Sequence, residues 1–246
     1  LPEEPEVPAP AALRAAPPRV STNATAGAQR SRAFVVVFDN LNMTPFRARD
    51  AKGAVASFLG RGVRAGDYVT LISTGDATWW TARMESGRPK LLDMVKRFDG
   101  RYIPDTSQER LTDWEALRIH VYRDPQVTER VMRRYETYGV GSSLNRSQDS
   151  SGRAGTVEDP YITGRASEVY YQATAKNKIT LNTMERALNA LAGSKGRKSM
   201  ILVSQGFIFD PNLDEFRNVV QASRRGNAAV YFVDTMGLGG MPIGMT

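Results

Sequence analysis

The sequence predicts an α/β fold in which a doubly wound, mainly parallel sheet carries helices on both faces and one antiparallel strand at its edge. Three short apolar runs support this prediction, because continuous apolar strands are typical of sheets that are buried on both sides. Segments with helical spacing of apolar residues separate the runs, and alternation of strand and helix favours parallel pairing. The runs are FVVVF (34–38), SMILVS (199–204) and AAVYFVD (228–234).

The first half of the chain adds two strands and two helices. A strand is expected at 68–74, after a turn at Gly66, and the alternating segment 78–84 predicts an antiparallel strand at the sheet edge. Pro45 suits the first turn of the helix that follows it. The core positions expected in the two helices are Ala51, Val55, Phe58 and Leu59, and then Leu91, Leu92, Val95 and Phe98.

The middle third interrupts this alternation. Two helical stripes flank Asp124 and Pro125, and the Gly- and Ser-rich segment 139–155 predicts a loop. We interpret about 102–178 as a helical and loop insertion. Regular alternation then resumes with two further helices. The core positions expected are Trp114, Leu117 and Val121; Val127, Val131, Tyr135 and Tyr138; Met184, Ala187, Leu188 and Leu191; and Leu213, Phe216 and Val220.

Residues 1–32 are rich in proline, alanine and small polar residues, which predicts an extended arm. We expect the arm to lie along a surface, either of another subunit, which we favour, or of its own domain. The first residue is Leu1 and not methionine, which suggests that a signal peptide or other upstream segment has been removed. The apolar anchors expected in the arm are Leu1, Val7, Leu13 and Val20.

Composition excludes several classes of site. The chain of 246 residues contains no cysteine, so thiolate zinc sites, disulfides and cysteine nucleophiles are excluded. His120 is the only histidine, and the glycines match no nucleotide-binding motif, so we do not expect an enzyme. The net charge of +7 is weak evidence of an anionic partner, and we expect no nucleic acid. No apolar run reaches the roughly 18–20 residues that span a bilayer.

Four segments occur in an order that resembles the von Willebrand factor A (VWA) superfamily, and within it the VWFA-related domains of exported proteins of Acidobacteria. The resemblance covers about 34–100 and 180–240. It implies a VWFA-like domain at 33–246, an extracytoplasmic location (periplasmic or secreted), and a role in protein binding or adhesion. The segments are RAFVVVFDNLN, FLGRGVRAGDYVTLIST, TMERALNALAGSKGRKSMILVSQGF and NAAVYFVDTMGLGG.

The resemblance also implies a metal site, built by a DxSxS motif, a later threonine and a second aspartate. Asp39 matches the leading aspartate and Thr183 the threonine, but Leu41 and Met43 replace the serines and Ser204 stands near the second aspartate position. We therefore expect a degenerate site without a metal, in which Asp39 caps the following turn through backbone N–H groups. If Mg²⁺ were retained, the ligands expected are Asp39, Asn42, Thr44, Thr183 and Ser204.

Two adjacent tryptophans indicate a contact surface. Trp79 and Trp80 point to opposite faces of the expected edge strand, so one should be exposed unless the middle insertion covers it. The basic residues near the first helix indicate a solvated face; they are Arg47, Arg49, Lys52, Arg61 and Arg64.

Three functions remain open from the sequence. The first is a non-enzymatic protein-interaction module, an accessory subunit of an exported envelope or extracellular assembly that is contacted through the arm. The second is a divalent-metal-dependent adhesion receptor. The third is an enzyme of the doubly wound class, for which Asp39 and Asp234 are the only titratable groups expected at the strand ends, at the edge that Ser204 shares.

Overall fold

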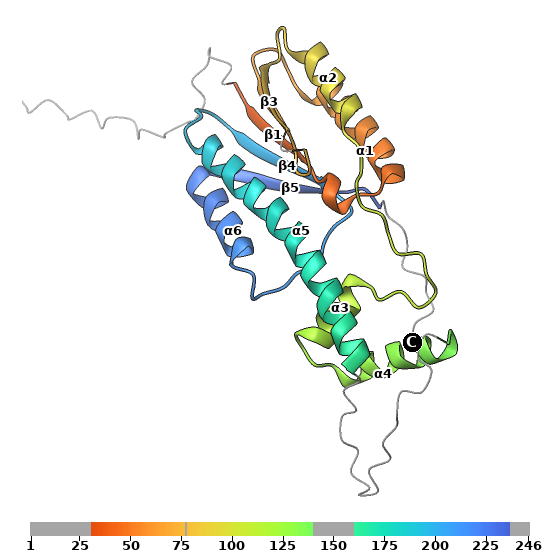
Figure 1. Ribbon diagram of the computed structural model, residues 1–246. Helices are drawn as coiled ribbons and strands as arrows, with labels where there is room; N and C mark the ends of the chain where they lie inside the picture. Colours follow the sequence, from red (N-terminus) through yellow and green to blue (C-terminus); the bar gives the residue numbers. More distant parts are fainter. Residues whose placement is uncertain (1–30, 77, 140–159, 237–246) are drawn as a thin grey trace, which may run out of the picture. The chain divides into compact units, whose positions relative to one another are not determined.

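The computed structural model describes residues 31–76, 78–139 and 160–236 (Figure 1). These residues form an α/β fold around a five-stranded sheet with the strand order β3-β2-β1-β4-β5. Four strands are parallel, and β3 pairs antiparallel with β2 at one edge, as the sequence predicts. The strands are β1 (Ala33–Phe38), β2 (Tyr68–Ser73), β3 (Thr78–Arg83), β4 (Lys198–Ser204) and β5 (Ala228–Asp234).

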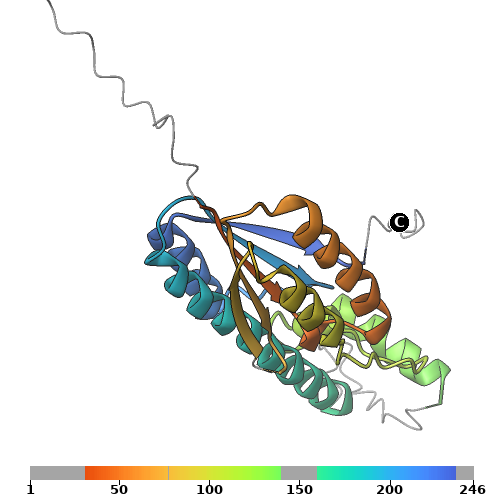
Figure 2. The ribbon, with the colours of Figure 1, turned by 90° about the horizontal axis from the view of Figure 1, so that it is seen from above.

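Helices lie on both faces of the sheet (Figure 2). Side chains alternate along β1, so Val36 and Phe38 pack in the layer of α1 (Pro45–Ser57) and α2 (Arg88–Arg97). Val35 and Val37 pack in the opposite layer, with α5 (Pro160–Ala192) and α6 (Asp214–Gly226). Burial on both faces explains why this strand is apolar at every position.

Local capping fixes where the helices begin. Thr44 accepts a hydrogen bond from the Arg47 N–H in front of α1. Thr112 and Glu115 form a capping box in front of α3 (Asp113–His120). Asp124 accepts two backbone N–H groups in front of α4 (Pro125–Thr137). Each cap satisfies amide groups that the first helical turn leaves without a partner.

A second core lies between α3, α4 and the amino-terminal part of α5. Its buried residues include Ala116, Val131 and Ile162. The helices α3 and α4 fall inside the expected insertion, but α5 continues without interruption from Pro160 to Ala192. The insertion boundary expected at residue 178 therefore lies within α5. This helix packs both in the core with α3 and α4 and in the layer that covers the sheet beside α6.

Some expected core positions are wrong. Trp114, Tyr138 and Val220 are 51%, 48% and 49% exposed. Large apolar side chains at helical spacing occur on surfaces as well as in cores, so spacing alone does not separate the two.

The arm lies outside the described residues up to residue 30, and so do its expected anchors Leu1, Val7, Leu13 and Val20. Within the part of the chain that the structure describes, no helix has the length and apolar character needed to cross a membrane.

Candidate functional site at the carboxyl edge of the sheet

The parallel strands end at one edge of the sheet. Phe38 at the end of β1 is in register with Ser73 of β2 and with Val203 of β4, and Ser204 is in register with Asp234 of β5. Asp39 follows β1 directly, and its N–H donates to the Val203 carbonyl at 2.9 Å. Asp39 and Ser204 therefore occupy the common edge that the sequence predicts.

The Asp39 carboxylate is fully buried and accepts four hydrogen bonds from side chains. Its Oδ1 accepts from the hydroxyls of Thr180 at 2.7 Å and Thr74 at 3.2 Å. Its Oδ2 accepts from the Ser204 hydroxyl at 2.7 Å and the Asn42 amide at 3.0 Å. A carboxylate has about four sites for accepted bonds, so this one is saturated. We call these five residues the Asp39 cluster.

Different elements supply the donors. Asn42 closes a 3₁₀ turn (Asn40–Asn42) directly after β1, Thr74 follows β2, Thr180 lies within α5, and Ser204 ends β4. The cluster thus ties two strands and a helix to the first strand, and its geometry depends on the whole sheet.

A neighbouring contact fixes the loop after β2. Asn40 is fully buried, and its Oδ1 accepts from the Gly75 N–H at 2.6 Å while its Nδ2 donates to Asp76 at 3.0 Å. A Cβ atom at Gly75 would lie 2.8 Å from Asn40 Oδ1, so a side chain there would force this loop to move.

The threonine of α5 that contacts Asp39 is not the one that the resemblance implies. Thr183 donates its hydroxyl to the Ile179 carbonyl of its own helix at 2.7 Å, and Thr180 contacts Asp39 instead. Three residues of α-helix span about 4.5 Å, so Thr180 and Thr183 lie on a similar side of α5 but at different heights. Only Thr180 lies level with the end of β1.

Thr44, another of the ligands considered, is also outside the cluster. Its hydroxyl caps α1, and its N–H donates to the Gln205 side chain at 2.6 Å. At the two positions where the resemblance implies serine, Met43 is fully buried in the core of the α1 layer and Leu41 is half-buried. Asn42 and Ser204 do contact Asp39.

The expected capping role of Asp39 needs correction. The 3₁₀ turn after β1 has no side-chain cap, and the carboxylate is held by side-chain donors. The signal for these donors was weak in the sequence, because Thr74 and Thr180 follow no spacing that points to Asp39.

The cluster offers a cation one carboxylate and several hydroxyl oxygens. Among the described residues, no group of three or more His, Cys, Asp or Glu side chains lies together. A hydroxyl that donates to Asp39 keeps lone pairs, so Thr74, Thr180 and Ser204 could serve as ligands beside Asp39. With a single negative charge, the site would hold Mg²⁺ weakly, because this ion favours carboxylate ligands.

Asp234 does not join the cluster. It lies at the end of β5, and β4 stands between β5 and β1. Its Oδ1 accepts from the Met236 N–H at 2.8 Å. The pair of strand-end carboxylates that an enzyme could use is therefore divided by a strand.

His120 packs in the helical region, at the end of α3. Burial lowers its pKa, and the charge of Arg123 lowers it further. Its Nδ1 lies 2.8 Å from the Ser167 hydroxyl, which donates to a carbonyl of its own helix, and its ring lies 4.7 Å from that of Tyr170. The nearby Asp210 accepts from Tyr170 at 2.5 Å. These contacts join α3, α5 and the segment after β4 around the His120 ring.

Trp79 and Trp80 lie on opposite faces of β3, as the sequence predicts. Trp79 is in register with Ile72 of the α5 layer and Trp80 with Leu71 of the α1 layer. They are 39% and 40% exposed, and the Arg186 guanidinium of α5 lies 6.0 Å from the Trp79 ring. Both tryptophans thus present apolar surface at this edge.

Comparisons with models of protein families, with curated proteins and with solved structures find no match to this chain.

Proposed function

We propose that the chain is a non-enzymatic protein-interaction module, a VWFA-like domain that serves as an accessory subunit of an exported envelope or extracellular assembly. The observation that carries this proposal is the saturated, fully buried carboxylate of Asp39. In α/β sheets this edge is the usual place for a ligand site. Here the carboxylate of Asp39 accepts hydrogen bonds from side chains of the chain itself, and so stabilises the fold.

The strand order supports the doubly wound topology of the VWA superfamily. From β1 the sheet extends to β2 on one side and to β4 on the other, and the helices beside β2 and β4 lie on opposite faces. Asp39 and Ser204 thus occupy the point where the strand order reverses, which is the position of the metal site that the resemblance implies.

Two surfaces are proposed to meet the partner. The first is the exposed pair Trp79 and Trp80, because aromatic side chains are enriched at protein interfaces. The second is the arm, whose prolines reduce the entropy lost when it docks.

Deleting residues 1–30 is expected to reduce recovery of the assembly on the order of tenfold, equivalent to about 1.4 kcal/mol of lost contacts. The measurement is quantitative cross-linking mass spectrometry of the natively purified complex, beside the melting temperature of the truncated chain. The deletion keeps Arg32, which bonds Asp67, so the melting temperature should not change. Retention of the whole assembly by the truncated chain would contradict contact through the arm.

The second candidate function is a divalent-metal-dependent adhesion receptor with a degenerate VWA site. It is favoured by the convergence of three hydroxyls on Asp39. Mg²⁺ bound there would supply a positive charge for a carboxylate of the partner. Asp39, Thr74, Thr180 and Ser204 would hold the ion, at the cost of hydrogen bonds that now saturate Asp39.

A titration with Mg²⁺ or Mn²⁺ is expected to leave the melting temperature unchanged. A metal receptor would instead gain about 2.7 kcal/mol when the free ion reaches about 100 times its Kd. Sodium chloride of equal ionic strength controls for screening of the net charge of +7. A metal-specific rise that disappears in Asp39→Asn would overturn the closed site and support the receptor.

A further inference from the structure

The last strand, β5, forms the open edge of the described sheet. Four consecutive apolar residues of β5, Val230 to Val233, are 39%, 56%, 53% and 37% exposed. The equivalent run of β1 is almost completely buried. An apolar edge strand of this kind is a template for pairing with another strand.

Both faces of β5 are accessible. The register with β4 places Val230 and Phe232 on the face of α5 and α6, and Tyr231 and Val233 on the face of α1 and α2. Because residues of both faces are exposed, neither helical layer covers the edge. A second strand therefore has room to approach β5.

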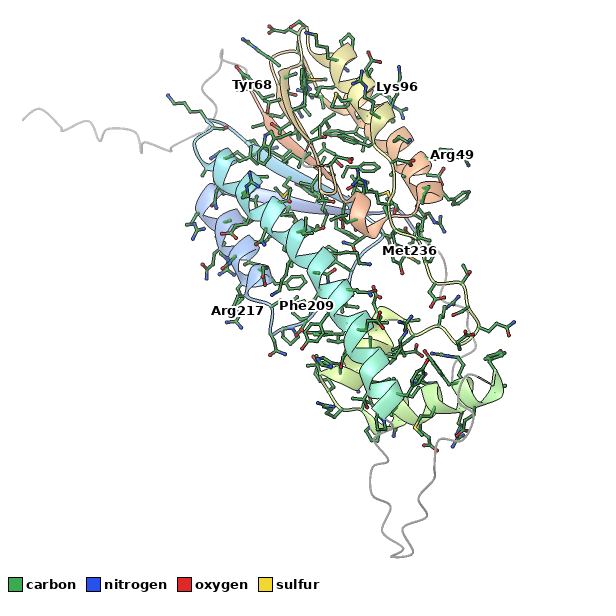
Figure 3. All side chains as sticks on the ribbon, in the orientation of Figure 1. Arg49, Tyr68, Lys96, Phe209, Arg217 and Met236 are labelled. Atoms are coloured by element: carbon green, nitrogen blue, oxygen red, sulfur yellow. The ribbon has the colours of Figure 1, made fainter. Side chains whose placement is uncertain are left out.

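The helix α6 carries apolar side chains to one side of its contact with α5. Gly226 marks the side that faces α5, because a Cβ atom there would lie 3.3 Å from the Leu188 carbonyl oxygen. At about 100° per residue, Phe216 and Val220 lie about 80° and 120° around the helix from Gly226. They line a groove of about 500 Å³ together with Phe209, Leu213 and the rim residues Arg217 and Arg224. Figure 3 labels Phe209 and Arg217 near the start of α6.

We propose that β5 pairs antiparallel with β5 of a second copy of this chain, joining two five-stranded sheets into one across a twofold axis. A twofold axis perpendicular to the sheet makes the two edge strands antiparallel and closes the assembly at two copies. The same operation keeps both α6 helices on one face of the joined sheet, because an axis perpendicular to the sheet does not exchange its faces.

The sequence of β5 is complementary to itself in this arrangement. With Tyr231 opposite its own mate, Val230 faces Phe232 and Ala229 faces Val233, so neutral side chains meet at the centre of the paired strands. The strand contains no lysine, arginine or proline, which are common means of protecting an edge.

Asp234, the charged residue of β5, also gains a partner of opposite charge in this arrangement. Asp234 of one copy lies opposite Ala228 of the other, and Ala228 is in register with Lys198 of β4. The Lys198 ammonium is held next to β5 by the Gly226 carbonyl at 3.0 Å. The twofold axis thus brings each Asp234 towards the Lys198 ammonium of the second copy, on the same face of the sheet.

Sedimentation equilibrium is expected to give twice the chain mass of 27.1 kDa. Tyr231→Lys and Tyr231→Glu should each be monomeric, because like charges then meet on the axis, and an equimolar mixture should regain the dimer. Trp80→Lys, a comparably exposed change on the opposite edge, should remain dimeric. A monomeric wild type, a Tyr231→Lys dimer, or oligomers larger than two would each overturn the proposal.

A cross-linking variant tests whether β5 pairs with β5 of a second copy even if the charged variants fail to fold. The chain has no cysteine, so Tyr231→Cys introduces a single thiol. Directly opposite residues of antiparallel strands have Cα atoms about 4.5–5.5 Å apart, which is within disulfide range. Mild oxidation should yield a covalent dimer of Tyr231→Cys and leave Trp80→Cys uncross-linked. Equal cross-linking of the two variants, or none at Tyr231→Cys, would show that β5 does not pair with itself.

Discussion

Replacing Asp39 by alanine is expected to lower the free energy of unfolding by about 3–5 kcal/mol. The change leaves the hydroxyls of Thr180 and Ser204 without their acceptor in a fully buried site. Thr74 keeps a contact to Asn40 Oδ1 at 3.1 Å, and Asn42 keeps only a long contact to Thr180 Oγ1 at 3.5 Å. Unsatisfied buried groups carry their full cost of desolvation, and the lost side chain also leaves a cavity. Urea denaturation at neutral pH, with far-UV circular dichroism as the signal, measures the loss.

Two variants separate this network from the general effect of losing an aspartate. Asp39→Asn keeps the size of the side chain, and up to two of the hydroxyls can rotate to accept from the two N–H groups of the new amide, so a smaller loss is expected. Asp93→Ala removes an exposed carboxylate that pairs with Lys96 on the surface of α2 and should change the stability little. A loss in Asp39→Ala no greater than that in Asp93→Ala would show that the cluster does not stabilise the fold.

The sheet could be predicted from the sequence because each of its strands is a short apolar run or an alternating segment. The positions of Asp39 and Ser204 followed, since residues that end parallel strands share an edge. The exposure of β5 could not be predicted from the sequence. A strand at the edge and one in the centre of a sheet can have the same composition, and only the strand order distinguishes them.

Thr180 was missed because α5 buries polar residues. Thr174, Asn177 and Thr180 interrupt the apolar pattern, which conceals the amino-terminal extension of the helix. Their partners come from distant segments: Asn177 donates to the Ile208 carbonyl at 3.1 Å, and Thr180 to Asp39. Periodicity detects burial among apolar groups, whereas buried polar groups are satisfied by tertiary contacts that no local pattern contains.

Glu115→Ala is expected to destabilise the helical region by about 2–4 kcal/mol, measured by hydrogen exchange of the α3 and α4 amides. The Glu115 side chain is only 9% exposed and forms a bidentate pair with Arg134, both bonds at 3.0 Å. It also accepts the Thr112 N–H at 3.0 Å in the capping box of α3. One carboxylate therefore joins the start of α3 to α4, and its loss leaves the Arg134 guanidinium without its anion.

The same carboxylate gives this region a dependence on pH whose sign is set by its partners. Burial would raise the pKa of Glu115, but hydrogen bonds from Arg134 and Thr112 outweigh burial and hold the pKa below its usual value. A depressed pKa contributes stability that is complete above the unfolded value of about 4.3 and is lost as the pH falls through the folded value. The difference in stability between the wild type and Glu115→Gln should therefore be largest near neutral pH and shrink on acidification below about pH 4.3.

Glu129 provides the matched control, because it forms an i,i+4 pair with Arg133 on the exposed side of the neighbouring helix α4. Exposed pairs of this kind contribute about 0.3–0.5 kcal/mol, since water and salt screen them and two long side chains must be ordered. Glu129→Ala should therefore leave the protection of the α3 and α4 amides almost unchanged. If Glu129→Ala and Glu115→Ala reduced protection equally, or if the effect of Glu115→Gln did not vary with pH, the buried pair could not be what holds α3 to α4.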